Sequence, residues 1–252
     1  MIHGFRGTHD GMDLIVKHLS GQRTIVPDLP GFGGGEVLGD YSIDSYVAWL
    51  HHFIDSQKLH VPPVLLGHSF GTIVAAAYAR EFPKTISRLV LVNPIGAPAL
   101  KGPNQLLTQL ALFYYWLGSV MPERLAARWL RLGIVVWVMN VTMTKSKEKA
   151  TRKYVRDQHR QFFSTFHSAA SVSQAFKASV SHNVSEYAPG INVPTLLIAG
   201  AQDDITPLKK QQQLQKMFPH ATLRIIDHVG HLTHYETPDQ VAAFVQDFIK
   251  SA

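Results

Sequence analysis

A serine in a glycine-bounded pentapeptide is the part of this sequence with the most chemical content. The pentapeptide is Gly67-His68-Ser69-Phe70-Gly71. It follows the pattern of a buried strand and opens the pattern of a helix, which is the context in which a G-x-S-x-G sequence predicts a nucleophile elbow. The glycines let the chain turn sharply and hold the serine hydroxyl above the sheet in a strained backbone conformation. We therefore expect Ser69 to be a nucleophile in acyl transfer, with the amide of Phe70 as one donor to the oxyanion.

Candidates for the acid and the base that a serine nucleophile needs stand later in the chain. A serine hydroxyl is a poor nucleophile at neutral pH and needs a histidine base, whose tautomer an acid fixes. The chain offers Asp203 and Asp204, then His228, His231 and His234, in the order serine, acid, histidine. Each group follows a predicted strand, at the strand end where sites collect in open α/β sheets. The histidines straddle a glycine loop instead of sharing one helix, so we expect no metal site.

Alternating strands and helices must position these residues. Short apolar runs that are rich in Val, Ile and Leu and bounded by Pro or Gly predict buried parallel strands. The predicted strands are residues 24–26, 64–66, 89–92, 195–199 and 223–226. The predicted helices of this part of the chain are residues 43–57, 72–81, 209–217 and 239–249. Such alternation predicts an α/β fold with a mostly parallel sheet flanked by helices.

The alternation stops in the middle of the chain, where helical character continues without a convincing strand. Residues 106–117 and 129–143 are strongly apolar and aromatic, whereas residues 145–160 are rich in Lys and Arg. An insertion of this kind covers the core and is where substrate choice resides. The predicted domains are an α/β core at residues 1–94 and 190–252 and a helical cap at residues 95–189.

Together the motifs resemble the α/β-hydrolase superfamily, in the group of capped esterases and carbon–carbon bond hydrolases. They are His3-Gly4-Phe5, Asp28-Leu29-Pro30-Gly31-Phe32-Gly33, the pentapeptide around Ser69, Gly200-x-x-Asp203 to Pro207, and Gly230-His231 before Glu236-x-Pro238. The resemblance covers nearly the whole chain and implies the α/β-hydrolase fold with a helical cap insertion. In the family pattern the acid stands three residues after a glycine and the base follows a glycine directly. This implies a catalytic triad of Ser69, Asp203 and His231.

The resemblance also implies the rest of the catalytic machinery. The second oxyanion donor of the family comes from the His-Gly-Phe loop, which here implies the amide of Phe5 beside that of Phe70. No cofactor is implied. Related enzymes have two strands and most of a third before this loop, where the chain has only Met1 and Ile2. We therefore expect the N-terminal strands to be missing, which would leave backbone groups of a central strand unpaired. A misassigned start or a truncation is the preferred explanation, and a natural protein that has dispensed with these strands is the alternative.

Composition and charge limit the classes of partner. The 252 residues are 46% hydrophobic and 17% charged, which is typical of a globular protein, and they include no cysteine. The net charge of +6 arises in residues 99–186, which hold twelve Lys and Arg against four Asp and Glu. No recognition motif accompanies this charge, so we expect no nucleic-acid partner. No leader pattern follows Met1, and we expect a cytoplasmic location.

Aromatic side chains are frequent in the predicted cap. They are Phe113, Tyr114, Tyr115, Trp116, Trp129 and Trp137. Such residues either pack cap helices together or line a pocket for an apolar acyl group. We expect Trp116 and Trp137 to bind the small-molecule acyl substrate.

An apolar run and a basic run adjoin each other in the cap. Residues 133–139 are apolar all round, but they are far fewer than the roughly twenty residues that a membrane-spanning helix needs. The Lys and Arg residues of 145–160 follow shortly after them. Peripheral contact with anionic lipid through the cap and an ordinary solvated charged face are the two interpretations of this pattern.

These observations predict a serine hydrolase that cleaves a carboxylic ester through an acyl-enzyme, with an apolar acyl group. Relatives that act on haloalkanes or epoxides carry aspartate in the elbow, where this chain has Ser69. A carbon–carbon bond hydrolase, a thioesterase and an acyltransferase with the same triad remain alternatives. A non-catalytic ligand-binding protein on a hydrolase scaffold is an alternative of another class, against which the intact triad argues. The oligomeric state is unknown from sequence.

Overall fold

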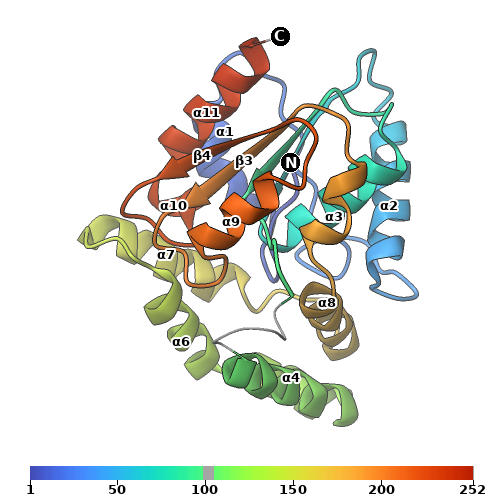
Figure 1. The fold of residues 1–252 in the computed structure, drawn as a ribbon. Helices are drawn as coiled ribbons and strands as arrows, with labels where there is room; N and C mark the ends of the chain where they lie inside the picture. Colours follow the sequence, from blue (N-terminus) through green and yellow to red (C-terminus); the bar gives the residue numbers. More distant parts are fainter. Residues whose placement is uncertain (99–104, 252) are drawn as a thin grey trace.

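A parallel sheet forms the centre of the molecule. The computed structural model describes residues 1–98 and 105–251 (Figure 1). Four strands lie side by side in chain order: β1 (Val64–His68), β2 (Arg88–Val92), β3 (Thr195–Gly200) and β4 (Ala221–Ile226). In the register, Leu89 of β2 pairs with Leu65 of β1 on one side and with Thr195 of β3 on the other. Four of the five predicted strands are therefore confirmed, each within two residues of its predicted bounds.

The prediction of a strand at residues 24–26 was wrong. In the described chain the carbonyl oxygen of Ile25 accepts a hydrogen bond from the amino group of Met1, at 2.7 Å, but residues 24–26 form no ladder. The reason lies beside β1, where Ile2 forms a single bridge: its amide donates to the carbonyl of Leu66, and its carbonyl accepts from the amide of His68. A strand needs a neighbour long enough for repeated pairing. One bridging residue does not supply it.

Helices cover both faces of the sheet (Figure 1). Helices α1 (Asp13–His18) and α11 (Pro238–Lys250) pack on one face, whereas α2 (Ile43–Ser56), α3 (Phe70–Glu81) and α9 (Leu208–Gln215) pack on the other. Successive side chains of a strand point to opposite faces. Leu65 of β1 accordingly belongs to the core under α2 and α3, and Leu66 belongs to the core under α1 and α11.

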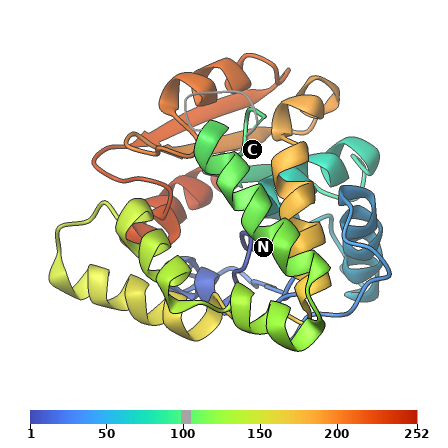
Figure 2. The same cartoon turned by 90° about the horizontal axis from the view of Figure 1, so that it is seen from below.

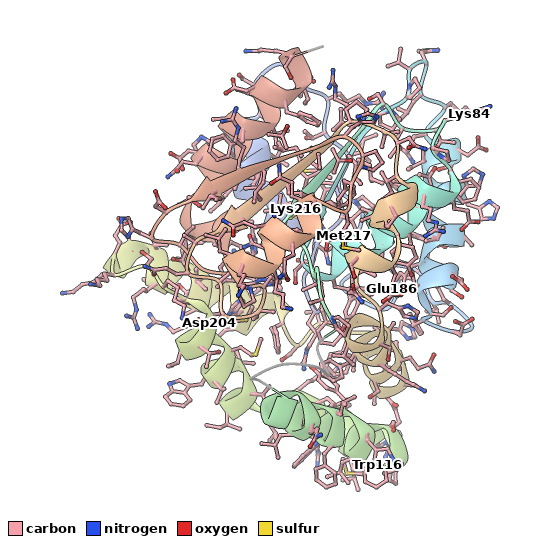
Figure 3. The ribbon with its side chains drawn as sticks, in the orientation of Figure 1. Lys84, Trp116, Glu186, Asp204, Lys216 and Met217 are labelled. Atoms are coloured by element: carbon pink, nitrogen blue, oxygen red, sulfur yellow. The ribbon has the colours of Figure 1, made fainter. Side chains whose placement is uncertain are left out.

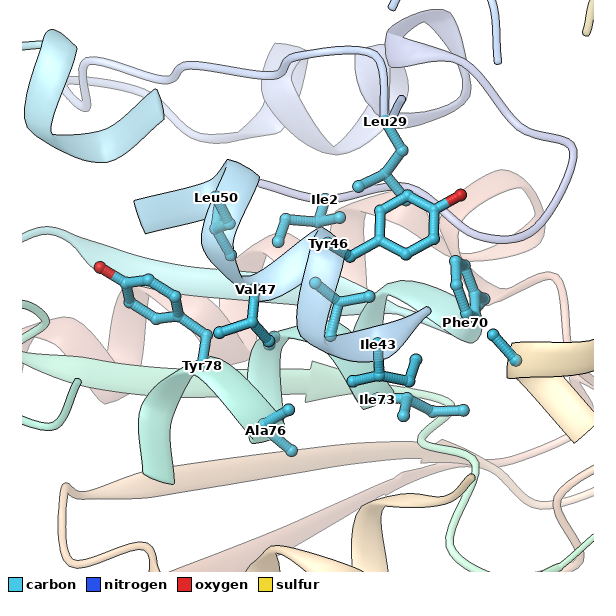
Figure 4. Packing of buried hydrophobic residues seen from close by; sticks show 14 of the residues in the cluster. Ile2, Leu29, Ile43, Tyr46, Val47, Leu50, Phe70, Ile73, Ala76 and Tyr78 are labelled. Atoms are coloured by element: carbon cyan, nitrogen blue, oxygen red, sulfur yellow. The ribbon is translucent and has the colours of Figure 1, made fainter. Parts of the chain in front are cut away.

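The larger hydrophobic core anchors the serine turn. Figure 4 shows Tyr46 of α2 beside Phe70 and Ile73 of α3, among the buried residues on this face of the sheet. Phe70 directly follows Ser69 and is 1% exposed. Full burial of a phenylalanine side chain contributes roughly 1.5–3 kcal/mol. Packing of Phe70 therefore holds the first turn of α3 in place.

The described chain between β2 and β3 is helical. Its α-helices are α4 (Gln105–Val120), α5 (Glu123–Leu130), α6 (Gly133–Met143), α7 (Lys149–Phe162) and α8 (Ala169–Ser181). Short 3₁₀ helices lie at His9–Met12, Val184–Glu186 and Ala188–Gly190, and α10 is Thr233–Glu236. Helices α4 and α6 lie at the end of the molecule farthest from α11 (Figure 1), and seen from below α4 to α8 spread across one face (Figure 2). We call α4 to α8 the cap. Residues 99–104 of the predicted cap and residue 252 of the predicted core lie outside the described residues.

One stretch of the cap, Glu123–Met143, is long and apolar enough to cross a membrane by length and composition alone. The sequence prediction considered only residues 133–139 and found them too short. The longer stretch joins α5 to α6, although the helix is interrupted at Arg131 and Leu132. Only 17% of its most apolar window is buried. These apolar residues therefore lie mainly at the surface.

Candidate active site

The turn between β1 and α3 places Ser69 in a strained conformation. Its φ of 51° and ψ of −120° lie in a region that residues other than glycine rarely adopt. The carbonyl oxygen of Ser69 accepts a hydrogen bond from the amide of Thr72 at 2.8 Å, which closes the turn. The hydroxyl sits at the N-terminus of α3, where partial positive charge gathers. The strained turn expected for a nucleophile elbow is present.

Two glycines of the pentapeptide are needed for close backbone approach. A Cβ atom at Gly67 would lie 2.4 Å from the carbonyl oxygen of Gly71. A Cβ atom at Gly71 would lie 2.6 Å from the carbonyl oxygen of His3. A larger residue at Gly67 would force the turn itself open, and one at Gly71 would push the turn away from the His3 loop. The two glycines therefore keep the serine beside the loop that carries Phe5.

A continuous hydrogen-bonded chain joins Ser69, His231 and Asp203. The Oγ atom of Ser69 is 2.8 Å from Nε2 of His231, and Nδ1 of His231 is 2.8 Å from Oδ2 of Asp203. An ionised carboxylate only accepts hydrogen bonds, so Nδ1 carries the proton and Nε2 is free to accept from Ser69. The structure thus brings the three predicted triad residues together from three separate loops.

Asp203 accepts hydrogen bonds at both carboxylate oxygens. Its donors are the amides of Ile205 and Thr206, the hydroxyl of Thr206, the side-chain amide of Asn93, and His231. Burial alone raises the pKa of this carboxyl group, but the charge of His231 and the hydrogen bonds from His231 and Thr206 outweigh burial. Together they hold the pKa of Asp203 well below its ordinary value. Asp203 is therefore ionised at neutral pH.

Asn93 belongs to the site, although sequence reasoning did not select it. It directly follows β2, is fully buried and has a φ of 47°. Its Nδ2 atom donates to Oδ2 of Asp203 at 2.9 Å and to the carbonyl of Gly230 at 3.2 Å, while Oδ1 accepts from the hydroxyl of Thr233. Asn93 thus ties the acid loop to the loop before His231. A polar residue at the carboxyl end of a buried strand was the available signal.

The amides of Phe5 and Phe70 are the candidate oxyanion donors: Phe70 directly follows Ser69, and a Cβ atom at Gly4, the neighbour of Phe5, would lie 3.2 Å from the Cβ atom of Ser69. Within the described residues, neither amide donates a hydrogen bond to the chain. The loop that carries Phe5 is shaped by His3, whose Nε2 accepts from the amide of Leu29 and whose Nδ1 donates to the carbonyl of Gly4, both at 2.8 Å. Burial lowers the pKa of His3 to about 4, so the ring is neutral and its tautomer is set. This geometry is compatible with two preorganised oxyanion donors.

Three further histidines near the site do not complete a metal centre. His68 is buried, which lowers its pKa to about 3, and its Nε2 donates to the carbonyl of His231 at 3.2 Å. His234 packs with its ring centroid 4.0 Å from that of His68, and burial holds its pKa well below the ordinary value. His228 is exposed in the loop. Across the part of the chain that the structure describes, no group of three or more His, Asp or Glu converges to hold a metal ion.

Aromatic rings from the core and the cap surround Phe5. The ring centroids of Phe32, Phe70, Tyr115 and Phe176 lie between 5.6 and 6.4 Å from that of Phe5. Tyr115 belongs to α4 and Phe176 to α8, and these two rings stack with centroids 4.0 Å apart. The cap therefore meets the core in an apolar cluster next to Ser69.

The structure does not place the two tryptophans predicted to bind substrate in this cluster. Trp116 is 56% exposed and Trp137 is 59% exposed. Figure 3 shows Trp116 at the end of the molecule remote from the sheet. Tyr114 and Trp129 bond to each other's backbone carbonyls at 3.0 Å and so hold α4 against α5. Sequence alone had no means to tell inward-facing from outward-facing aromatic residues of the cap.

Arg6 joins the oxyanion loop to the cap. Its guanidinium donates to the carbonyls of Phe163 at 2.8 Å and Leu130 at 2.7 Å, and to the hydroxyl of Tyr115 at 3.2 Å. The group also lies 4.1 Å from the ring centroid of Phe163. Arg6 is 2% exposed, and no acidic side chain in the described residues forms an ion pair with it. Carbonyl dipoles and ring faces therefore replace a counter-ion.

A protein-family model described as alpha/beta hydrolase fold matches residues 1–238. The chain belongs to this family. Monoacylglycerol lipase ABHD6 of Homo sapiens is 28% identical over 260 residues, which cover 100% of this chain and 74% of that protein. Lipase 3 of Moraxella sp. (strain TA144) is 26% identical over 258 residues, with 96% and 74% covered. An esterase from Thermogutta terrifontis superposes with a TM-score of 0.81 at 22% identity, over 99% of this chain and 88% of the esterase.

The two lipase relatives support a hydrolase that acts on esters, and the likeness to the solved esterase shows the fold. The family pattern also selects one of two adjacent acids, and the structure separates them. Asp203 contacts His231, whereas Asp204 is exposed and pairs with Lys145. We expect Asp203→Asn to lower kcat by about four orders of magnitude, because the amide no longer holds the proton of His231 on Nδ1. Asp204→Asn should lower kcat by less than about tenfold, because an exposed ion pair contributes little. Steady-state rates on p-nitrophenyl butyrate measure both, and equal losses would contradict the assignment.

Arg6 offers a prediction for the stability of this α/β hydrolase. Arg6→Met keeps a long apolar side chain but leaves buried acceptors on Phe163, Leu130 and Tyr115 without their donor. We expect the free energy of unfolding to fall by roughly 2–4 kcal/mol in urea titrations. Arg131→Met is the control, because Arg131 is exposed and makes one backbone hydrogen bond, at 3.2 Å, within the described residues. A loss as large at Arg131 as at Arg6 would mean that the buried hydrogen bonds contribute nothing specific.

Proposed function

We propose that the protein is a serine hydrolase that cleaves a carboxylic ester with an apolar acyl group through an acyl-enzyme. The observation that carries the proposal is the chain of 2.8 Å contacts from Ser69 through His231 to Asp203. Two amides without partners in the described chain, those of Phe5 and Phe70, lie beside the same serine. Nucleophile, base, acid and oxyanion donors are the complete set that acyl transfer needs.

Each residue then has a definite step. Oγ of Ser69 attacks the ester carbonyl carbon while Nε2 of His231 takes the hydroxyl proton. The carbonyl oxygen becomes an oxyanion that accepts hydrogen bonds from the amides of Phe5 and Phe70. Collapse breaks the bond to the alcohol, which leaves with the proton from His231. A water molecule, activated by the same histidine, then attacks the acyl-enzyme and releases the acid and Ser69.

The apolar character of the acyl group rests on the surroundings of Phe5. Rings of Tyr115 and Phe176 from the cap approach Phe5 beside the serine, and the buried cation Arg6 directs its hydrogen bonds to the cap. Relatives named as a monoacylglycerol lipase and as a bacterial lipase support an acyl chain as substrate. We therefore place the acyl group against α4 and α8.

The test is a series of p-nitrophenyl esters of graded acyl length. We expect activity to rise with chain length, and we expect Phe176→Ala to move the preference towards longer chains. One methylene in an apolar pocket changes kcat/KM by roughly 10–200-fold. Trp116→Ala should leave the length preference unchanged, because its side chain is mostly exposed. A shift with Trp116→Ala and none with Phe176→Ala would restore the tryptophan pocket predicted from sequence.

A fluorophosphonate probe separates the remaining alternatives. Labelling together with ester turnover supports the proposal. Labelling without turnover of any ester would favour a carbon–carbon bond hydrolase, a thioesterase or an acyltransferase with the same residues. If the probe does not label the protein and no ester is turned over, a ligand-binding protein on a hydrolase scaffold is favoured.

A further inference from the structure

Two cap helices present apolar side chains to solvent. Ten of the fifteen large hydrophobic side chains that are exposed in the described residues belong to the cap. Eight of the ten lie on α4 and α6: Leu110, Phe113, Trp116, Val120, Ile134, Trp137, Val138 and Val141. Each of these eight is 43–60% exposed. We call these eight residues the apolar face of the cap.

Helical spacing makes each set of four a continuous stripe. On α4 the intervals are three, three and four residues, and on α6 they are three, one and three, so each set returns to one side of its helix. The inward side of α4 is apolar as well, because Tyr115 packs on Phe176. A helix at the surface of a soluble protein ordinarily turns polar residues outward. Contiguous apolar patches of this kind mark interaction sites.

The charge beside the apolar face is positive. Arg124 and Arg128 of α5 and Arg152 and Arg156 of α7 are exposed, and within the described residues none of these four side chains forms a hydrogen bond or ion pair. The acidic residues of the same helices are engaged. Glu123 accepts from the amide of Ala169, and Asp157 pairs with Lys153. Seen from below, α4 to α7 lie across one face of the molecule (Figure 2), so the two helices that carry these arginines share that face with α4 and α6. An anionic partner fits this rim.

We propose that the apolar face of the cap docks on the surface of an anionic phospholipid bilayer. The two tryptophans lie at the acyl-chain boundary, where their amphipathic rings are favoured, and the arginines of α5 and α7 contact lipid phosphates. The helices lie on the bilayer instead of crossing it, because Arg128 and Arg131 fall within the longest apolar stretch and an arginine at the bilayer centre is strongly unfavourable. Docking would bring the candidate active site to esters that partition into lipid. This implication for the substrate rests on the proposed function.

Flotation of the Ser69→Ala protein with vesicles tests the docking while leaving the lipids intact. We expect binding to vesicles of phosphatidylcholine with phosphatidylglycerol, weak binding to phosphatidylcholine alone, and release by concentrated NaCl. Trp116→Gln with Trp137→Gln should weaken binding at least about tenfold. The matched control is Val37→Gln with Val61→Gln, which replaces two exposed apolar residues outside the cap. These control changes should leave binding unaltered.

A second pair of variants tests the charged rim. Arg124→Glu with Arg128→Glu should weaken binding at least about 30-fold, because each cation near an anionic surface contributes roughly fivefold in affinity and charge reversal removes at least both contributions. Arg23→Glu with Lys84→Glu changes the net charge equally at exposed positions outside the cap, and Figure 3 shows Lys84 far from Trp116. Brominated lipids should quench the tryptophan fluorescence of the protein with its cap unaltered. This measurement needs no variant to fold.

Several results would overturn the docking. They are equal binding to neutral and anionic vesicles, unchanged vesicle binding in the tryptophan or arginine double variant, and no quenching of tryptophan fluorescence by brominated lipids. Resistance to alkaline carbonate would instead show a spanning helix. If the protein is a dimer, and Trp116→Gln with Trp137→Gln abolishes the dimer, the apolar face would be the interface with a second copy of the chain. Vesicle binding is measured on Ser69→Ala, so it does not depend on catalysis. Failure to bind vesicles would contradict the docking and leave the proposed function standing. Lack of ester turnover in the unaltered protein would contradict the proposed function and leave the docking standing.

Discussion

Replacement of Ser69 by alanine is expected to abolish ester hydrolysis while the fold stays intact. The hydroxyl is the only group at this turn that can form the acyl-enzyme under the proposed function, and loss of a triad serine lowers kcat by about a millionfold. Stability should change little, because alanine needs only the same strained φ that Ser69 already adopts. Steady-state kinetics on the preferred p-nitrophenyl ester and urea unfolding measure the two quantities. The Ser69→Ala protein should still hydrolyse the ester about a thousandfold faster than the uncatalysed reaction in water, because its oxyanion donors remain.

The control for Ser69 is a serine of the cap. Ser173 is largely buried on α8 and donates to the carbonyl of Tyr115 at 3.1 Å. Ser173→Ala should retain activity and fluorophosphonate labelling. Mass spectrometry of the labelled protein should find the probe on Ser69. A probe on any other residue, or an unchanged rate in Ser69→Ala, would remove the proposed nucleophile.

His231→Ala is expected to match Ser69→Ala in its loss of kcat, because the serine and its base act as a unit. The informative comparison is His234→Ala, since His234 is also buried and lies three residues away. Its contacts are to the rings of His68 and Tyr235, with centroids 4.0 and 3.9 Å away. His234→Ala should therefore cost about 2 kcal/mol of unfolding free energy through lost packing, with kcat within about tenfold of the parent.

His228→Ala completes the set, because His228 is exposed in the same loop. It should change neither stability nor kcat appreciably. If all three histidine variants lost activity to a similar degree, and added Zn²⁺ restored the parent after chelation, the triad would give way to a metal site. Loss confined to His231 supports its role as the base.

Local pattern was sufficient for the elements that carry the site. Four of the predicted apolar runs correspond to β1 to β4. Each of these strands is short and pairs with at least one other strand of the sheet. The glycines at 67 and 71 indicated the turn, because a Cβ atom at either position would lie only 2.4 or 2.6 Å from a carbonyl oxygen. The family pattern that the motifs resemble, in which the acid and the base stand at fixed distances from a glycine, selected Asp203 and His231 over their neighbours. These features depend on a few adjacent residues or on a family pattern, so sequence holds the information.

The failures have a common cause in contacts between residues distant along the chain. Residues 24–26 have the composition of a strand, but pairing depends on what lies beside β1, where a single residue forms a bridge. Trp116 and Trp137 resemble pocket residues by type, yet the packing of α4 on α8 turns other aromatic residues inward. Composition does not specify which side of a helix meets the core.

Sequence by itself determined which residues form the candidate site of this protein: a serine between two glycines, an acid and a histidine after later strands, and an α/β sheet to present them. Tertiary structure decided what supports that chemistry. Asn93 bonds to Asp203 across 110 positions of sequence, and Arg6 bonds to Phe163 across 157. A lone polar residue carries no periodic signal, and its role exists only once burial removes water and leaves one set of partners within reach. The outward apolar face of the cap was decided in the same way, by which sides of α4 and α6 the rest of the fold leaves uncovered.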